Sequence, residues 1–329
     1  MNILITGTTG YIGYKLAMAA AKKGYQVNAL VRNVLSSNLP KHSNIKFFRG
    51  DITDPGSIIP AVKACDFVFH AAGLTQLWNK DRTIFYKVNV EGTRNMLEAS
   101  LKEGLKKFVF TSSCAVLGPS NGRPVSEDDP RIIPYENDYE ISKHCAEELV
   151  KEYSRKGLFA LTVCPSRVYG PGLDTKGNPI NQLLKNTLQS GVALMPSASC
   201  IVGNYAFIDD VVEGHFLAME KGLGGEKYIL GGENISYKDF FITVQKQSNE
   251  KIIVFTIPKF LLKSFSALIF FAHYLTGKHT HISPKTIDRI LQNRALTCNK
   301  AVHQLGYRIT PFSQGIYQTI HHLKTKQYV

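Results

Sequence analysis

The chain has 329 residues, of which 44% are hydrophobic and 20% are charged. This composition excludes a mostly disordered chain, because there is enough apolar surface to bury and too little charge to keep the chain expanded. Six widely spaced cysteines without a Cys-x-x-Cys pair exclude a disulfide scaffold, and we expect no metal site. The length corresponds to one large or two modest domains.

The formal net charge of +13 is unevenly distributed. Residues 251–329 hold eleven Lys and Arg against a single acid, Asp288, and so carry +10 of it. A basic surface attracts phosphates, nucleic acid or anionic lipid, and a solvated face that binds nothing is the alternative. The chain starts without a basic leader segment, and no uncharged apolar run reaches about 18 residues. We therefore expect a cytoplasmic protein.

Short apolar runs alternate with helical segments in the first half of the chain. Strands are expected at residues 2–6, 26–31, 45–49, 66–70, 107–111 and 159–164, and helices at 12–23, 56–63, 85–102 and 139–156. Such alternation predicts an α/β fold, with a Rossmann-type, doubly wound parallel sheet covered by helices on both faces. We expect this dinucleotide-binding domain to span residues 1–165.

The second half of the chain is less regular. Prolines and glycines break the alternation after residue 165, and strand-like runs return only at 204–210 and 227–230. These two runs predict that the sheet is completed after an excursion. Residues 166–203 and 231–329 are then expected to form a smaller, partly discontinuous substrate-binding lobe.

A glycine-rich turn lies between the first expected strand and the first expected helix. Residues 6–13 read Thr-Gly-Thr-Thr-Gly-Tyr-Ile-Gly. Gly7 permits the tight turn, Gly10 lets the backbone approach a pyrophosphate, and Gly13 lets the helix pack closely on the strand. The helix N-terminus then offers free N–H groups to the anion. This Gly-x-x-Gly-x-x-Gly turn resembles that of the extended short-chain dehydrogenase/reductase family.

The resemblance implies a set of residues that bind a nicotinamide dinucleotide. They belong to the glycine turn, to the ends of the following strands, to an expected helix and to the loop after residue 164: Gly7, Thr9, Gly10, Tyr11, Ile12, Gly13, Asp51, Ile52, Ala71, Ala72, Gly73, Lys143, Pro165 and Val168. A helix cap is an equal alternative for Asp51. Asn89 matches a family position near the cofactor, but it also fits an ordinary helix.

The end of the second strand indicates which cofactor is used. Enzymes that use NAD place an acidic residue there for the ribose 2′-hydroxyl, whereas this chain has Val31 followed by Arg32. A guanidinium can bind a 2′-phosphate through two hydrogen bonds. The sequence therefore favours NADP over NAD. If Arg32 is an ordinary surface charge, the enzyme would accept either cofactor.

A Tyr-x-x-x-Lys pattern at Tyr139 and Lys143 predicts the catalytic residues. The same pattern occurs twice elsewhere, at Tyr11 and Tyr274, so context decides. Tyr139 and Lys143 are one turn apart on an expected helix, and a serine at the end of the fifth strand precedes them. The resemblance aligns Ser113, not Ser112, with the family's catalytic serine.

The resemblance also implies the role of each of these residues. Tyr139 exchanges a proton with a carbonyl or alcohol oxygen while hydride moves to or from the nicotinamide. Lys143 lowers the pKa of the phenol and holds the nicotinamide ribose, and Ser113 orients the reacting oxygen. Ordinary surface and turn positions are the alternative for all three.

Residues 252–275 form the most apolar stretch and bear on the substrate and partners. Lysines interrupt it, so it suits either a core helix or a helix attached to a membrane surface. Both readings favour a hydrophobic ketone or alcohol as the substrate. Within the family, the chain most resembles the dihydroflavonol reductase and 3β-hydroxysteroid dehydrogenase branch. A nucleotide-sugar epimerase and a non-catalytic dinucleotide-binding scaffold remain alternatives; a homodimer is compatible with the sequence, and nucleic acid is not the expected partner.

Overall fold

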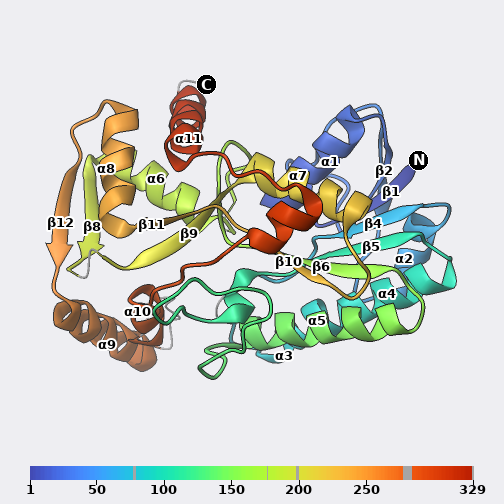
Figure 1. The fold of residues 1–329 in the computed structure, drawn as a ribbon, viewed down its shortest axis with the longest axis horizontal. Coiled ribbons are helices and arrows are strands. Elements are labelled where there is room, and N and C mark those ends of the chain that lie inside the picture. Colours follow the sequence, from blue (N-terminus) through green and yellow to red (C-terminus); the bar gives the residue numbers. More distant parts are fainter. Residues whose placement is uncertain (77–78, 176, 198–199, 277–283, 328–329) are drawn as a thin grey trace.

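A computed structural model describes residues 1–76, 79–175, 177–197, 200–276 and 284–327. Its centre is a parallel sheet in the order β10-β6-β5-β4-β1-β2-β3 (Figure 1). The strands are β1 (Asn2–Thr6), β2 (Gln26–Val31), β3 (Ile45–Arg49), β4 (Phe67–His70), β5 (Lys107–Thr111), β6 (Ala160–Pro165) and β10 (Lys227–Leu230). The predicted α/β, Rossmann-type fold is confirmed.

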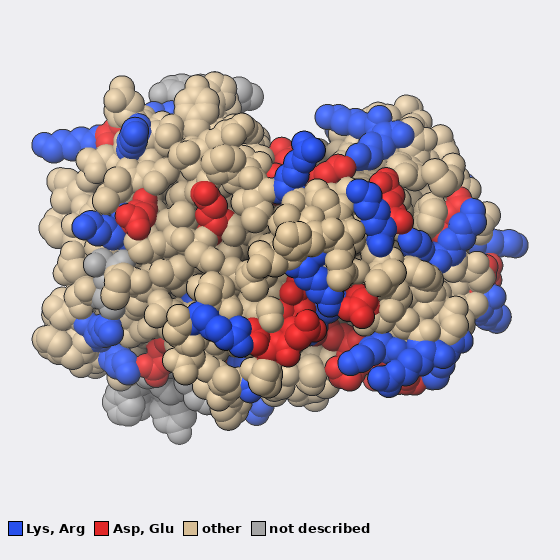
Figure 2. Space-filling model, viewed as in Figure 1, with Lys and Arg blue, Asp and Glu red and all other residues tan. Residues whose placement is uncertain are grey.

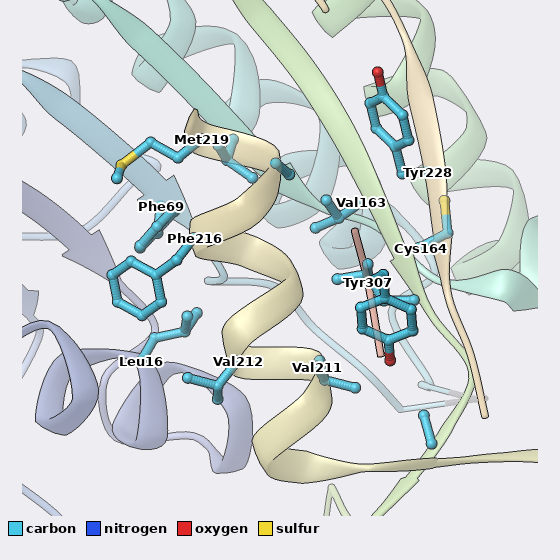
Figure 3. Close-up of a cluster of buried hydrophobic side chains, with 14 of the residues drawn as sticks. Leu16, Phe69, Val163, Cys164, Val211, Val212, Phe216, Met219, Tyr228 and Tyr307 are labelled. Atoms are coloured by element: carbon cyan, nitrogen blue, oxygen red, sulfur yellow. The ribbon is translucent and has the colours of Figure 1, made fainter. Parts of the chain in front are cut away.

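Helices cover both faces of this sheet because the strands are apolar on both sides. α1 (Tyr11–Lys22) and α7 (Ile208–Lys221) share one core with Ile3 and Ile5 of β1. On the other face, α2 (Pro55–Val62), α4 (Gly92–Lys102) and α5 (Asp138–Arg155) pack around Leu4. Figure 3 shows the first core, with Phe216 of α7 between Leu16 and Phe69.

The strand order reverses direction at the carboxyl end of β1, and we call the place beyond this edge of the sheet the crevice. The chain runs from β1 outward to β2 and β3, and then returns to the other side of β1 to form β4. The connections that leave β1 and β4 therefore diverge to opposite sides, and ligands of open parallel sheets bind at such a point. The glycine turn follows β1 and lies at this crevice.

The helix expected at residues 85–102 is present but is not uniform. It begins as α3 (Thr83–Phe85), passes through a π-helical turn, η1 (Tyr86–Glu91), and continues as α4. A π-helical turn holds one extra residue per turn and often occurs at functional sites. This turn contains Asn89.

One of the two runs expected to complete the sheet lies elsewhere. Residues 227–230 form β10 beside β6, as expected. The run at 204–210 instead contributes to β9 (Val202–Phe207), which pairs with β7 (Arg167–Tyr169) and β11 (Glu233–Ser236) in a separate sheet. The reason is that the chain leaves the main sheet after Pro165, so β7 takes β9 as its partner.

The small sheet belongs to a second lobe, which we define as β7, β9 and β11 with the elements around them. Those elements are α6 (Pro179–Ser190), β8 (Val192–Pro196), α8 (Tyr237–Ser248), β12 (Ile253–Ile257), α9 (Lys259–Thr276), α10 (Pro284–Ile290) and α11 (Phe312–Gln327). Its core is aromatic: the Phe312 ring contacts those of Tyr169, Tyr205 and Phe240, and Tyr205 also contacts Phe240. Two short turns, η2 (Cys114–Leu117) and η3 (Ala301–Leu305), lie beside the main sheet.

The apolar stretch at 252–275 is not the core helix that was one of the two expectations. Its first part is β12, and Pro258 separates this strand from α9. Four large apolar side chains of α9, Phe260, Leu261, Phe265 and Leu268, are 47–67% exposed. Among the described residues, no helix is both long and apolar enough to span a bilayer.

Candidate active site

The glycine turn packs directly against the end of β4. Gly7 has a φ of +75°, and a Cβ atom on it would lie 2.7 Å from the carbonyl carbon of Ala71 and from the nitrogen of Ala72. A Cβ on Gly13 would lie 2.2 Å from the carbonyl oxygen of Gly7. Both positions therefore require glycine, and the turn presents bare backbone to the crevice.

The N-terminus of α1 is open to a ligand. Its N-cap residue is Gly10, so no side chain caps the first N–H groups, among which are those of Tyr11 and Ile12. The buried hydroxyls of Thr8 in the turn and of Ser166 after β6 have no hydrogen-bond partner among the described residues. Buried polar groups normally have partners. These open N–H groups and hydroxyls fit a dinucleotide whose pyrophosphate lies on α1.

Two of the residues predicted to contact the cofactor also have local structural roles. The Asp51 carboxylate accepts hydrogen bonds of 2.9 Å from the backbone nitrogen and the hydroxyl of Thr53, so it caps the turn that leads to α2. Ile52 is buried and packs against Gly92 of α4. The N-cap of α2 itself is Asp54.

Arg32 lies exposed just after β2. Val31 before it is buried, and no ion pair or hydrogen bond of the Arg32 side chain occurs within the described ranges. A guanidinium in this place is available to an anion at the adenosine end of the crevice.

The two serines at the end of β5 have different partners. The Ser112 hydroxyl donates a 2.5 Å hydrogen bond to the buried carboxylate of Glu147, which also pairs with Lys227 at 2.9 Å. The Ser113 hydroxyl instead accepts a 3.2 Å hydrogen bond from the backbone nitrogen of Ala115 and lies close enough to the Tyr139 phenol to lower its pKa. Ser113 is thus the serine that shares a site with the tyrosine.

Tyr139 and Lys143 are both buried on α5, and burial disfavours the charged form of each. Burial raises the pKa of the Tyr139 phenol, while the nearby Ser113 hydroxyl and the positive charge of Arg289 act to lower it. Burial lowers the pKa of the Lys143 ammonium to about 8. The expected fall in the pKa of the phenol is therefore not met, because burial outweighs the nearby charges.

Lys143 is held by the end of β5 and faces the loop after β4. Its Nζ donates a 2.7 Å hydrogen bond to the carbonyl oxygen of Thr111 and lies 4.0 Å from the centre of the Phe110 ring. A Cβ added to Gly73 would lie 3.9 Å from that Nζ. The Ala71–Gly73 loop and Lys143 therefore border the same space.

Asn89, in the π-helical turn, connects this loop to α5. Its side chain accepts from the Leu74 nitrogen at 2.7 Å and donates to the Leu74 oxygen at 3.1 Å and to the Ser142 hydroxyl at 2.9 Å. These three bonds favour a structural role beside the predicted site over an ordinary exposed helix position. They fix the Gly73 loop relative to Lys143.

A buried histidine that the sequence analysis missed extends this network. His70 bonds Thr6 through Nδ1 at 2.8 Å and Thr93 through Nε2 at 3.1 Å. The Thr93 hydroxyl donates to the carbonyl oxygen of Asn89 at 2.7 Å. Burial lowers the pKa of His70 to about 3, so the ring is neutral. Its position at the end of β4 was the only sequence signal for it.

Tyr11 connects the glycine turn to Gly170, which directly follows β7; of the residues expected in the cofactor loop, Pro165 ends β6 and Val168 lies within β7. The Tyr11 hydroxyl donates a 2.6 Å hydrogen bond to the carbonyl oxygen of Gly170, which also accepts one of 2.8 Å from the Asn181 side chain. No sequence pattern pointed to Asn181, because it lies 170 residues from Tyr11. Among the described residues, no group of three or more His, Cys, Asp or Glu could hold a metal ion.

Residues 3–231 match the family model described as "NAD dependent epimerase/dehydratase family". The chain belongs to this family. It is thus an NAD(P)-dependent enzyme of the oxidoreductase or epimerase type, in agreement with the resemblance to extended short-chain dehydrogenases/reductases.

Curated relatives cover almost the whole chain. A "Putative dihydroflavonol 4-reductase" of Synechocystis sp. is 29% identical over 99% of this chain and 95% of its own length. A 3-beta-hydroxysteroid dehydrogenase of Mycolicibacterium neoaurum is 25% identical over 93% of this chain and 86% of its own length. Among solved structures, gox2253 has a TM-score of 0.83 and 30% identity, covering 99% of this chain and 98% of its own. A UDP-glucose 4-epimerase of Thermotoga maritima has a TM-score of 0.81 and 22% identity, covering 99% of this chain and 100% of its own. At this identity the likeness shows the fold alone.

Proposed function

We propose that the chain is an NADP-dependent oxidoreductase that transfers hydride between the nicotinamide and a hydrophobic ketone or secondary alcohol. One observation carries the proposal: Ser113 lies beyond the carboxyl end of β5, close enough to the Tyr139 phenol to influence it, and Tyr139 is one helical turn from Lys143. This edge of the sheet also holds the glycine turn. A proton carrier and a dinucleotide site therefore lie at the same edge.

Each of the three residues has a defined task in this proposal. The bound nicotinamide would supply or accept the hydride. Tyr139 gives a proton to the carbonyl oxygen in reduction and takes it from the alcohol in oxidation. Ser113 hydrogen-bonds the same oxygen and orients it, and Lys143 holds the nicotinamide ribose. Arg32 would bind the 2′-phosphate of NADP, with NAD accepted less well.

The second lobe is proposed as the substrate lobe; because it contains β9 (Val202–Phe207), it extends beyond the expected segments 166–203 and 231–329. Its aromatic core and its exposed apolar elements suit a hydrophobic substrate better than a sugar nucleotide. The names of the dihydroflavonol reductase and hydroxysteroid dehydrogenase relatives support that class. We also propose that the exposed apolar side chains of this lobe contact a membrane surface, from which such a substrate would be taken.

The experiment that tests the function is turnover with Tyr139→Phe. Because only the proton carrier is removed, we expect reduction of a panel of cyclic ketones with NADPH to fall by about 10²-fold or more, while NADPH affinity stays nearly unchanged. The readouts are nicotinamide absorbance for turnover and calorimetry for binding.

Tyr153→Phe is the matched control for this test. Tyr153 lies on the same helix, but its hydroxyl donates to Glu98 on the outer side, so turnover is expected to persist. Turnover of Tyr139→Phe at the wild-type rate would refute the mechanism. Turnover of UDP-sugars but of no ketone by the wild-type chain would refute the substrate class.

A further inference from the structure

A buried carboxylate follows the proposed catalytic tyrosine directly. Glu140 is fully buried in the first turn of α5, and two arginines pair with it. Arg131, in the loop before α5, reaches Oε2 at 2.7 Å, and Arg289, in α10 of the second lobe, reaches Oε1 at 2.6 Å. The neighbour of Tyr139 in the chain is therefore held from both lobes.

A second carboxylate just before α5 makes the same connection. Glu136 accepts 2.9 Å and 2.6 Å hydrogen bonds from Gln292 and Arg294, which follow α10. We call Glu136, Glu140, Arg289, Gln292 and Arg294 the clasp. The clasp joins the end of α10 to the start of α5, two segments about 150 residues apart in the chain (Figure 1).

The clasp also places a positive charge beside the turn that holds the phenol, because Arg289 lies 2.6 Å from Glu140, the residue that follows Tyr139. The polar groups that influence Tyr139 come from four elements: Ser113 before η2, Cys164 of β6, Glu140 of α5 and Arg289 of α10. Arg289 is the cation that the second lobe contributes, and Lys143 lies one helical turn from Tyr139 on α5 itself. A cation near a phenol stabilises the phenolate.

We propose that Arg289 is a positioning residue which the second lobe supplies to the active site. Through Glu140 it fixes the first turn of α5 and so the position of Tyr139, and its charge stabilises the phenolate. Proton transfer then reaches its full rate only when the two lobes are in contact at the clasp. This inference rests on the proposed function, because it assumes that Tyr139 carries the proton.

The structure also indicates which variant can test the inference. Glu140 keeps Arg131 as a partner when Arg289 is replaced, so Arg289→Gln leaves no buried carboxylate without a cation. Replacing Glu140 itself would leave two arginines without their shared acid. Arg289 is partly exposed, which further reduces the cost of replacing it.

We expect Arg289→Gln to shift the pH profile of kcat to higher pH by about half a unit or more, since loss of the cation raises the pKa of the phenol. In alcohol oxidation, Tyr139 must be deprotonated, so the rising limb of the kcat–pH profile shifts to higher pH. In ketone reduction, Tyr139 must be protonated, so the falling limb of the profile shifts to higher pH as well. KM for NADPH should stay unchanged, and Arg289→Lys should restore the wild-type profile.

Arg82→Gln is the matched control, because Arg82 pairs with Asp138, the other chain neighbour of Tyr139, at 2.8 Å but at the surface. Its pH profile should equal that of the wild type. A second readout needs no substrate: tyrosinate absorbance on alkaline titration, taken as the difference between each protein and its Tyr139→Phe counterpart, should move in the same direction. An unshifted profile in Arg289→Gln, or an equal shift in Arg289→Lys, would overturn the inference. Wild-type turnover in Tyr139→Phe would instead refute the proposed function.

Discussion

At the scale of single residues, the proposed site is made of groups that burial keeps from being charged. The Tyr139 pKa is raised and the Lys143 pKa is lowered to about 8, both chiefly by loss of solvent. Ser113 and Arg289 oppose the rise for the tyrosine. The acidity of the phenol therefore depends on contacts from several elements, and the spacing of Tyr139 and Lys143 alone does not determine it.

Arg32 is the residue expected to decide between the two cofactors. We predict that Arg32→Ala weakens NADP binding by about tenfold or more, because a hydrogen bond to a charged group contributes roughly 1.5–3 kcal/mol. NAD has no 2′-phosphate, so its affinity should change little. Calorimetric titration with both cofactors measures the two effects. Arg155→Ala, which removes an exposed arginine at the far end of α5, should change neither affinity, and equal losses of NADP and NAD in Arg32→Ala would contradict the assignment.

At the scale of elements, the glycine turn packs closely against the start of α1, where Gly13 approaches the backbone of Gly7. We predict that Gly13→Ala destabilises the fold by about 1–3 kcal/mol and abolishes cofactor binding, because its Cβ would lie 2.2 Å from the Gly7 oxygen and would push the turn off α1. Thermal unfolding and calorimetry measure the two losses. Gly56→Ala, in the first turn of α2, is the control, since its Cβ would meet only the Asp54 side chain at 3.5 Å. Cofactor binding by Gly13→Ala at wild-type affinity would show that the turn is not the binding site.

Local patterns predicted the elements that depend on local causes. The apolar runs of β1, β2 and β5 lie within the central sheet, and Gly24 and Gly104 end the helices before β2 and β5, so both signals were readable. The π-helical turn around Asn89 was not readable, because it depends on bonds to Leu74 and Ser142. The strand β12 could not be predicted either, because an apolar run does not show by itself that it pairs with a strand such as β8.

At the scale of the whole molecule, the contacts that complete the site join distant parts of the chain. Arg289 and Glu140 are 149 residues apart, and no periodicity or motif marks either of them. Tyr11 and Gly170 are 159 residues apart. The sequence could therefore place Tyr139 and the glycine turn on the correct elements, but it could not show how the second lobe meets them.

The second lobe also carries an apolar surface at the end of the molecule away from the central sheet (Figure 1). On paired strands β8 and β12, Val192 lies beside Ile253 and Leu194 beside Phe255, and all four side chains are exposed. The exposed side of α9 follows directly along the chain. We call this set, with Phe260, Leu261, Phe265 and Leu268, the apolar tip.

Lysines accompany the apolar tip, which makes an anionic membrane surface its expected partner. Lys259 and Lys263 lie on α9, and the chain from residue 251 carries a net charge of +10. Lys263 also pairs with Asp288 at 2.6 Å, so Lys259 contributes more of the attraction. Apolar burial and attraction to anionic lipid add in such helices. Lysines and arginines occur over much of the face that Figure 2 shows, so the apolar side chains distinguish the tip.

We predict that the chain co-sediments with vesicles of phosphatidylserine and phosphatidylcholine, and less with phosphatidylcholine alone. The double change Phe260→Ser and Phe265→Ser should reduce binding to the mixed vesicles by about tenfold or more, because two large apolar side chains no longer enter the lipid. Ile59→Ser, an exposed apolar side chain on α2, is the control and should bind like the wild type. Added salt should weaken binding to the mixed vesicles, since it screens the lysines. Vesicle binding by the double variant equal to that of the wild type would exclude the apolar tip as the membrane contact. If the wild-type chain does not bind vesicles but sediments as a larger species in the ultracentrifuge, a second copy of the chain covers the apolar tip instead.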